Sequence, residues 1–391
     1  MIGNSGTSIS RLQFSGHLAR GIMMKYNINE QMLGFDKVLT YEGQVPSLVE
    51  KEGKRYLRVN APEAGSVSFT YQDVEYPCEK NSDGIWQVEY TLTTNMNYVQ
   101  LKIDGVEVLT PMLPISYGYS RPYNYVELSS GDEFYCLKDV EHGTLRKEFF
   151  KSSVTNQWES CMVYTPAEYD KNTDKKYPVL YLQHGHGENE VGWSASGKVH
   201  FIMDNLIGED KAVPFIIVMN NGMVQVDGPD GDKIVDFRKF EDYLLQDVIP
   251  FIEGKYRVGT SKDMRAMAGL SMGSLQTSII GMNHPEMFSA LGIFSGFVTD
   301  IITGSELDQV NREASDNSHL KALESSNFNS YFDVYFRAMG QDDPFWENFA
   351  SDDELLEKHG INQIRKVYSG THDWNVWREC IRDFAQLIFK K

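Results

Sequence analysis

The sequence predicts two structural parts, a small antiparallel β-sandwich followed by a larger α/β part with a mostly parallel sheet. Between about residues 45 and 110, short runs of alternating apolar and polar residues are separated by turn residues. From about residue 145 onward, apolar runs such as YPVLYLQHG and FIIVMNNG alternate with longer segments of helical period. A length of 391 residues also suits two domains better than one.

The pattern of the first part ends at a cluster of prolines. Upstream, Asp104-Gly105 lies between two apolar runs, which is typical of a hairpin turn. Pro111, Pro114 and Pro122 then break the alternation, because proline cannot donate to a strand ladder. This cluster indicates a linker, with the domain boundary near residue 125.

Three segments follow from these patterns. Residues 1–30 are polar, rich in Gly and Ser and without a sustained period, which predicts a loose leader or a short docking segment. Residues 31–125 are expected to form the β-sandwich domain, and residues 126–391 the larger α/β domain.

Composition and charge exclude several classes of function. The apolar fraction of 41% supports packed cores, so extensive disorder is excluded. A formal charge of −18 repels phosphate backbones and anionic lipids, so neither nucleic acid nor a membrane surface is an expected partner. No signal peptide or bilayer-spanning stretch is visible. The chain as written is predicted to be cytoplasmic, or secreted if a signal was removed, and its oligomeric state stays open.

The cysteines predict no metal site. Cys78, Cys136, Cys161 and Cys380 are scattered and form no C-x-x-C pair. Buried free thiols are the favoured interpretation, and a disulfide among the first three stays open because the compartment is unknown.

The sharpest local signal is the pentapeptide Gly269-Leu270-Ser271-Met272-Gly273. It follows the apolar run MRAMA and precedes a segment of helical character, SLQTSIIGMNHPEMF. A nucleophile on a tight strand-to-helix turn needs small flanking residues, and this G-x-S-x-G arrangement is typical of the α/β-hydrolase fold. Ser271 is therefore the predicted nucleophile, and the backbone N–H of Met272 is a predicted oxyanion donor.

A serine hydroxyl needs a base, which this fold carries C-terminal to the nucleophile. His372 fits best, because KVYSGTHDWNVWREC predicts a strand, a loop and then an amphipathic segment. His284 lies in the helical segment after the pentapeptide, and His319 and His359 lie in polar stretches. We expect His284 to pack against or cap that helix, and His319 and His359 to be solvated.

The acid that orients the histidine should follow a strand between Ser271 and His372. The segment YFDVYFRAMGQDDPFW provides an apolar run that closes at Asp342-Asp343. One aspartate should face the histidine and its neighbour the solvent. Periodicity does not choose between them.

A second oxyanion donor is expected from a glycine-containing loop after an earlier strand. The run LQHGHG fits, and the backbone N–H of His186 is the candidate donor. The alternative is a metal site made by His184, His186 and Glu188, but no further ligand cluster accompanies them. No metal and no cofactor are therefore expected.

Aromatic and polar residues near these loops are candidates for substrate binding. Trp193, Trp374 and Trp377 could form a wall for a sugar ring or an aryl acyl group, and tryptophans at such positions are as often core residues. Trp374 and Trp193, together with Gln276, are the predicted substrate-binding residues.

With these residues in place, the chain resembles carbohydrate esterase family one, which contains feruloyl, acetylxylan and enterochelin esterases. The resemblance covers the chain from about residue 40 and is strongest in KYPVLYLQHGHGENEVGW, FEDYLLQDVIPFIEGKYRV, RAMAGLSMGSLQT, FSALGIFSG and GTHDW. Upstream, DGIWQVEYTL and VQLKIDGVEVLTP resemble the immunoglobulin-like module that precedes such esterase domains and is related to CBM48-type carbohydrate-binding modules. Carbohydrate binding by that module is a hypothesis.

The resemblance implies roles at matching positions. Ser271 falls on the family's nucleophile, His372 on its histidine and Asp343 on its acid, whereas Ser274 replaces the glycine that commonly follows the pentapeptide. The implied substrate is an ester on plant cell-wall polysaccharide, with feruloyl groups ahead of acetyl groups. The alternatives are a siderophore esterase, which the acidic charge disfavours, and a catalytically silent carbohydrate-binding protein.

Overall fold

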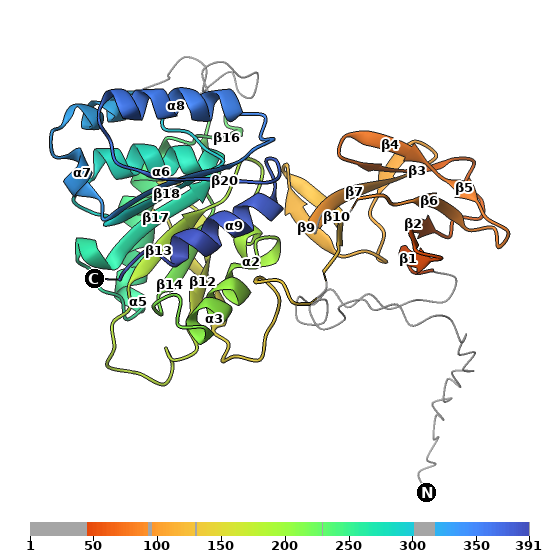
Figure 1. The fold of residues 1–391 in the computed structure, drawn as a ribbon, viewed down its shortest axis with the longest axis horizontal. Helices are drawn as coiled ribbons and strands as arrows, with labels where there is room; N and C mark the ends of the chain where they lie inside the picture. The colour runs from red at the N-terminus through yellow and green to blue at the C-terminus, as the bar shows by residue number, and fades with distance from the viewer. Residues whose placement is uncertain (1–44, 93–95, 130, 229, 301–316, 391) are drawn as a thin grey trace, which may run out of the picture.

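The computed structural model of the chain (Figure 1) describes residues 45–92, 96–129, 131–228, 230–300 and 317–390. The predicted leader, residues 1–30, lies outside these described residues. Within them, no helix is both long and apolar enough to cross a bilayer. All four cysteines are free and buried, which confirms the favoured interpretation.

The N-terminal part is built from two antiparallel sheets (Figure 1). Their strand orders are β1-β2-β6-β5 and β4-β3-β7-β10-β9, and β8 also pairs with β7. The strands are β1 (Leu48–Lys51), β2 (Lys54–Val59), β3 (Val67–Tyr71), β4 (Val74–Pro77), β5 (Glu79–Lys80), β6 (Trp86–Glu89), β7 (Met96–Ile103), β8 (Val106–Val108), β9 (Ile115–Gly118) and β10 (Arg121–Glu127).

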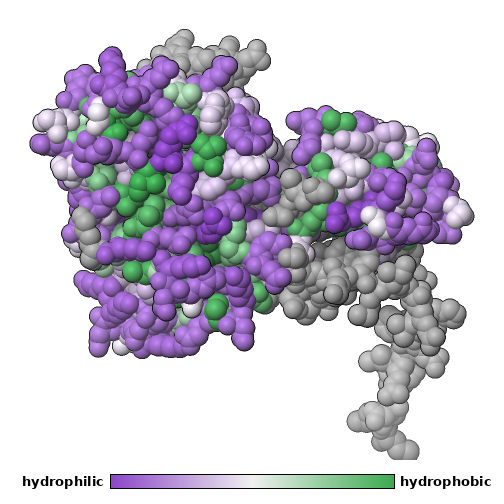
Figure 2. Space-filling model, viewed as in Figure 1, coloured by the Kyte–Doolittle hydropathy of each residue, from purple (hydrophilic) through white to green (hydrophobic). Residues whose placement is uncertain are grey.

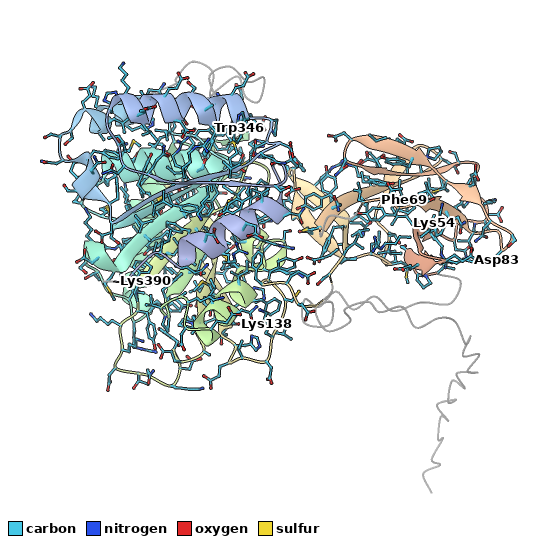
Figure 3. All side chains as sticks on the ribbon, in the orientation of Figure 1. Lys54, Phe69, Asp83, Lys138, Trp346 and Lys390 are labelled. Atoms are coloured by element: carbon cyan, nitrogen blue, oxygen red, sulfur yellow. The ribbon has the colours of Figure 1, made fainter. Side chains whose placement is uncertain are left out.

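Apolar side chains that alternate with polar ones along these strands form a separate core of the N-terminal part. Leu57 of β2, Phe69 of β3 and Leu101 of β7 belong to one buried cluster, and Phe69 is fully buried (Figure 3). The predicted β-rich region is thus present. Its kinship with immunoglobulin-like modules stays a prediction.

The prediction of a linker at the proline cluster was wrong. Residues 115–127 form the hairpin β9–β10, and β10 continues the sheet by pairing with β7. Pro122 is tolerated because the β7 ladder begins only at Asn124, so the missing N–H of Pro122 leaves no gap in that ladder. The hairpin projects toward the C-terminal part (Figure 1).

The C-terminal part is organised around an eight-stranded sheet of order β11-β12-β14-β13-β17-β18-β19-β20. The pairs β11/β12 and β12/β14 are antiparallel, and every other neighbouring pair is parallel. The strands are β11 (Thr144–Lys151), β12 (Trp158–Thr165), β13 (Val179–Gln183), β14 (Ile216–Asn220), β17 (Arg265–Leu270), β18 (Ala290–Phe294), β19 (Val334–Gly340) and β20 (Ile364–Tyr368). A small separate hairpin consists of β15 (Gln225–Asp227) and β16 (Lys233–Val235).

Helices cover both faces of this sheet, which explains the continuous apolar runs of its central strands. In β13, Val179 and Tyr181 belong to the cluster shared with α4, α5 and α6, whereas Leu180 and Leu182 belong to the cluster shared with α3 and α9. The helices are α2 (Gly192–Ala195), α3 (Val199–Gly208), α4 (Lys239–Tyr243), α5 (Ile249–Lys255), α6 (Met272–Asn283), α7 (Phe328–Tyr331), α8 (Trp346–Lys358) and α9 (Trp374–Ala385). A π-helical turn, Leu244–Val248, joins α4 to α5.

The molecular face in Figure 2 is mostly hydrophilic, in keeping with the formal charge of −18. This agrees with the segregation of apolar residues into the three buried clusters.

A buried ion pair fastens the N-terminal part to α9. Arg378 Nη1 lies 2.8 Å from Glu127 Oε1 at the end of β10, and the exposed side-chain fractions are 1% and 12%. Arg378 Nε also donates to the carbonyl of Ser196 (2.9 Å), and Lys198 Nζ lies 2.7 Å from Glu127 Oε2. The charge of Glu127 is therefore neutralised by two cations of the C-terminal part.

We predict that Arg378→Met lowers the free energy of unfolding by about 3 kcal/mol, because it leaves a largely buried carboxylate short of one partner. The matched control is Lys54→Met, whose ion pair with Glu89 is 56% and 41% exposed, so solvent screens it and its loss should change the free energy of unfolding far less. Urea denaturation of both variants measures the difference. Equal losses would contradict a structural role for the Arg378 pair.

Candidate active site

Ser271 lies on a strained turn between β17 and α6. Its backbone angles are φ 51° and ψ −118°, a conformation that a residue with a side chain rarely adopts. A Cβ at Gly269 would lie 2.3 Å from the carbonyl oxygen of Gly273, and a Cβ at Gly273 would lie 2.5 Å from that of His184. Both glycines of the pentapeptide are therefore required by close backbone approach.

Ser274, which departs from the family's usual glycine, fixes this turn from behind. It is fully buried, its Oγ donates to the carbonyl of Ser271 (2.5 Å) and it accepts from the N–H of Phe297 (3.1 Å). A Cβ at Gly296 would lie only 1.6 Å from Ser274 Oγ, so the Gly296 position supplies the room that the hydroxyl needs.

Parallel strands bring the predicted site residues to one edge of the sheet. Ser271 follows β17, Asp343 follows β19 and His372 follows β20, while the loop that begins at His184 follows β13. These strands run in parallel in the order β13-β17-β18-β19-β20, so their carboxyl ends meet at the same edge.

The structure places Asp343, rather than Asp342, beside His372. Asp343 Oδ2 lies 2.9 Å from His372 Nδ1, and Asp343 Oδ1 accepts from the N–H of Phe345 (3.0 Å). Asp343 is buried (3% exposed), whereas Asp342 is exposed. The loops are joined because the N–H of Asp342 donates to the carbonyl of Gly370 (2.9 Å).

His372 is also held by the start of α9. Asp373 caps this helix, and its side chain accepts from the N–H groups of Asn375 and Val376. The imidazole packs edge to face against Phe345 and Trp377, each with ring centroids 5.2 Å away. With Nδ1 bonded to Asp343, the ring has a fixed orientation and its Nε2 is available for proton transfer.

The loop after β13 lies directly against the nucleophile turn. A Cβ at Gly185 would lie 3.4 Å from Ser271 Cβ and 2.7 Å from Leu270 Cδ1, so a larger residue there would have to displace the buried Leu270 side chain. His186, the predicted second oxyanion donor, is the next residue, and its ring packs 5.7 Å from that of Phe237.

His184 has a structural role. Its Nδ1 donates to the carbonyl of Gly185 (2.7 Å), and its Nε2 accepts from the N–H of Gly222 (2.9 Å). Burial lowers the pKa of His184 to about 4, so the ring is neutral. Over the part of the chain that the structure describes, no three metal-ligating side chains gather, so the alternative metal site has no geometric support.

Glu188, which the sequence analysis named only as a ligand of the alternative metal site, lies at the active site. Its Oε2 accepts from the N–H of Gly185 (3.1 Å), which ties the carboxyl to the loop beside Ser271. Burial raises the pKa of Glu188 to about 8. The G-x-G-E spacing alone could have suggested this loop contact, but burial of the carboxyl is a tertiary property.

The predicted aromatic wall lies largely in the core. Trp193 is 1% exposed and its Nε1 donates to the carbonyl of Gln183 (2.7 Å), while Trp374 is 3% exposed and its Nε1 donates to Tyr98 Oη (3.2 Å). These positions leave almost no ring surface for a substrate. The two tryptophans therefore pack the site from behind in this structure, and their predicted substrate contacts gain no support.

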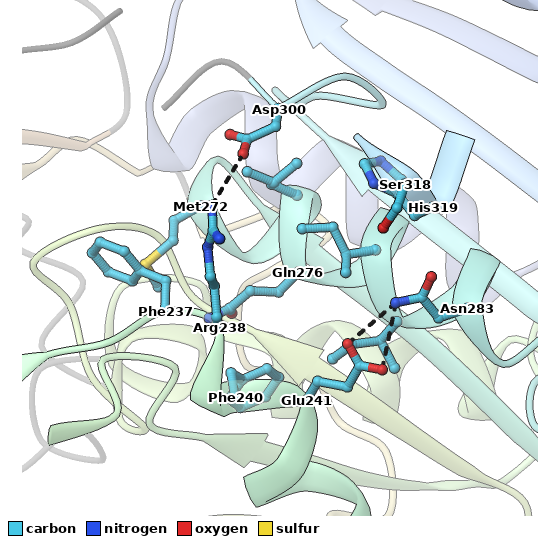
Figure 4. Close-up of a pocket in the computed structure, with 13 residues that line it drawn as sticks. Phe237, Arg238, Phe240, Glu241, Met272, Gln276, Asn283, Asp300, Ser318 and His319 are labelled. Carbon is cyan, nitrogen blue, oxygen red and sulfur yellow. Dashed lines mark hydrogen bonds and ion pairs between the residues drawn. The ribbon is translucent and has the colours of Figure 1, made fainter. Parts of the chain in front are cut away.

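Gln276 lines a pocket of about 190 Å³ along α6 (Figure 4). Its Nε2 donates to the carbonyl of Gly222 (3.0 Å), and among the described residues its buried Oε1 has no hydrogen-bond partner. Met272, the neighbour of Ser271, lines the same pocket. The other lining residues are apolar, polar and charged, namely Phe237, Arg238, Phe240, Glu241, Leu275, Ile279, Ile280, Asn283, Asp300, Ser318 and His319. His319 was expected to be solvated, but it is buried and its Nε2 donates to the carbonyl of Val298 (2.7 Å), so that prediction was wrong.

Comparison with curated proteins finds relatives in which the sequence similar to this chain lies within a longer protein. An endo-1,4-beta-xylanase/feruloyl esterase of Xylanibacter ruminicola is 32% identical over 359 residues, which cover 89% of this chain and 46% of that protein. Endo-1,4-beta-xylanase Y of Acetivibrio thermocellus is 29% identical over 187 residues, or 44% of this chain and 16% of that protein. The chain thus spans less than half the length of these two relatives.

Solved structures share the fold. A ferulic acid esterase is 26% identical with a TM-score of 0.54, over 64% of this chain and 98% of that one. The enterobactin esterase FES of Shigella flexneri, 13% identical, has a TM-score of 0.60 over 88% of this chain and 96% of that one, which shows likeness of fold alone. The predicted α/β-hydrolase fold is confirmed.

The model of the family described as putative esterase matches residues 152–385. This stretch contains both the turn at Ser271 and the loop of His372. The match covers more than half of the chain, and the chain therefore belongs to this esterase family.

Proposed function

We propose that the protein is a serine carboxylic-ester hydrolase that removes feruloyl groups from plant cell-wall polysaccharide or its oligosaccharides. The observation that carries the proposal is the hydrogen bond between His372 and buried Asp343, at the sheet edge where Ser271 occupies its strained turn. The named activities of the Xylanibacter relative and of the solved ferulic acid esterase support the feruloyl substrate.

The proposed reaction is acyl transfer. Ser271 Oγ attacks the ester carbonyl while His372 Nε2 accepts its proton, and Asp343 keeps the ring oriented and stabilises the imidazolium. The alcohol leaves with a proton from His372, and water then attacks the acyl-enzyme by the same route. The oxyanion is held by the N–H of Met272, which opens α6, and by that of His186 in the loop against Ser271.

The pocket along α6 suits the acyl group. Met272, the residue after the nucleophile, lines it, and it combines apolar walls with the amide of Gln276 (Figure 4). An aryl ring with hydroxyl or methoxy groups needs such a mixture of apolar surface and a few polar atoms. We therefore place the aryl acyl group in this pocket, with Gln276 as a polar contact.

The main alternatives differ in testable ways. An acetylxylan esterase would prefer the smaller acyl group, and a catalytically silent carbohydrate-binding protein would leave Ser271 unreactive toward a fluorophosphonate. The siderophore alternative has only likeness of fold in its support, and a polyanionic substrate would oppose the formal charge of −18.

We predict that the wild type hydrolyses 4-nitrophenyl ferulate and, with lower kcat/KM, 4-nitrophenyl acetate, two esters that share one leaving group. Ser271→Ala should lower kcat for both by at least about 10⁴-fold, because the nucleophile is lost. Absorbance assays of the two esters side by side measure both expectations. Preference for the acetyl ester would favour the acetylxylan alternative, and inactivity on both would contradict the proposal.

A second prediction separates the adjacent aspartates. Asp343→Asn should lower kcat about 10³- to 10⁴-fold, because the amide no longer stabilises the correct tautomer and the imidazolium. Asp342→Asn is the matched control and should stay within about threefold of the wild type, since its side chain is exposed. The reverse order of effects would assign the acid to Asp342.

A third prediction concerns pH. Because the pKa of Glu188 is about 8, its carboxyl is neutral below that pH and gains a negative charge above it. That charge, on the loop beside Ser271, opposes the developing oxyanion, so kcat/KM should fall several-fold between about pH 8 and 9.5. Glu188→Gln should remove this fall while retaining activity at pH 7. A fall of the same size in the variant would exclude Glu188 as its cause.

A further inference from the structure

The hairpin β9–β10 of the N-terminal part reaches the candidate active site. Tyr119 and Ser120 form its tip, and both have positive φ, 48° and 64°. Two consecutive residues of positive φ are typical of the tight turn that suits the twist of a two-residue hairpin. The tip is thus a defined turn, held by the pairing of Gly118 with Arg121.

This turn is anchored to the loop that carries the predicted oxyanion donor. The N–H of Ser120 donates to the carbonyl of Gly187 (2.6 Å). A Cβ at Gly187 would lie 2.8 Å from Tyr119 Cα, so only glycine allows the two backbones to approach this closely. Since Gly185 of the same loop abuts Ser271, the turn lies one loop away from the nucleophile.

The ring of Tyr119 is presented to solvent at this place. It is 66% exposed, and its contacts with Tyr98 (centroids 6.4 Å apart) and Tyr123 (6.0 Å) are edge to face rather than stacked. Tyr98 in turn accepts from Trp374, two residues after His372.

We propose that Tyr119 forms an aromatic subsite for a sugar ring of the alcohol portion of the substrate, supplied to the active site by the N-terminal part. This inference rests on the proposed function. A sugar that is part of a long polysaccharide can bind only at a site that is open to solvent. The apolar face of the sugar ring can then pack on an exposed aromatic ring. The pocket at Met272 and Gln276 is left for the acyl group.

The anchoring of the turn favours a subsite over a chance exposure. An aromatic ring contributes most when its backbone is already fixed, because less conformational entropy is lost on binding. The bond from Ser120 to Gly187 and the hydrogen bonds between Asn375 and Met96 hold the N-terminal part against both loops of the site. Tyr119 is therefore a specificity-determining residue rather than part of the catalytic machinery.

The experiment compares Tyr119→Asn with the wild type on methyl ferulate, which has no sugar, and on a feruloylated xylan oligosaccharide. Asparagine tolerates positive φ, so the turn is retained while the ring is removed. We expect KM for the oligosaccharide to rise about three- to tenfold, with KM and kcat for methyl ferulate within about twofold. Tyr119→Phe should restore the oligosaccharide KM, and Phe149→Asn, which removes a 61% exposed ring from the edge strand β11, should change neither substrate.

Binding separates this inference from the proposed function. Calorimetric titration of the unesterified xylan oligosaccharide into Ser271→Ala, with and without Tyr119→Asn, measures the subsite without hydrolysis. Weaker binding in the double variant supports the subsite even if the wild type hydrolyses neither ester, in which case only the feruloyl esterase proposal fails. An unchanged oligosaccharide KM and affinity, or an equal loss on methyl ferulate, would overturn the subsite.

Discussion

The absence of side chains at the pentapeptide's glycines is the constraint on which the site depends. A Cβ at Gly269 or Gly273 would lie 2.3 to 2.5 Å from a backbone oxygen, closer than side-chain atoms approach. Those contacts hold α6 against β13 and β17, so Ser271 takes a strained conformation that sequence context alone would not favour. The strain is offset by the burial of β17 and α6 between two apolar clusters.

Close backbone packing also fixes the loops next to this turn. Gly185 brings the loop after β13 against Ser271, and Gly187 of that loop receives the hairpin of the N-terminal part. On the opposite side, α9 begins two residues after His372 and is fastened to β10 by the Arg378–Glu127 ion pair. The N-terminal part therefore supports two of the loops around the site, and the two parts act as one structural unit there.

Several features could be read from local sequence because local physics decides them. The fully apolar runs of β13 and β14 predict strands buried on both faces, and the pentapeptide after an apolar run predicts the strand-to-helix turn. The scattered positions of the cysteines favoured buried free thiols but left a disulfide among the first three open, and the structure shows all four free. The linker at the prolines was wrong, because a proline is compatible with a strand wherever its missing N–H falls outside the neighbouring ladder.

The sequence by itself determined the fold class, the turn at Ser271, the loop of His372 and a pair of adjacent aspartates, since each depends on backbone preferences and spacing within a few residues. Only the tertiary structure decided which aspartate meets His372, that Trp193 and Trp374 are buried, and that Glu188 and Tyr119 lie at the site. The reason is physical: hydrophobic periodicity states which face of an element is buried, but contacts between loops far apart in sequence depend on how whole sheets and helices pack.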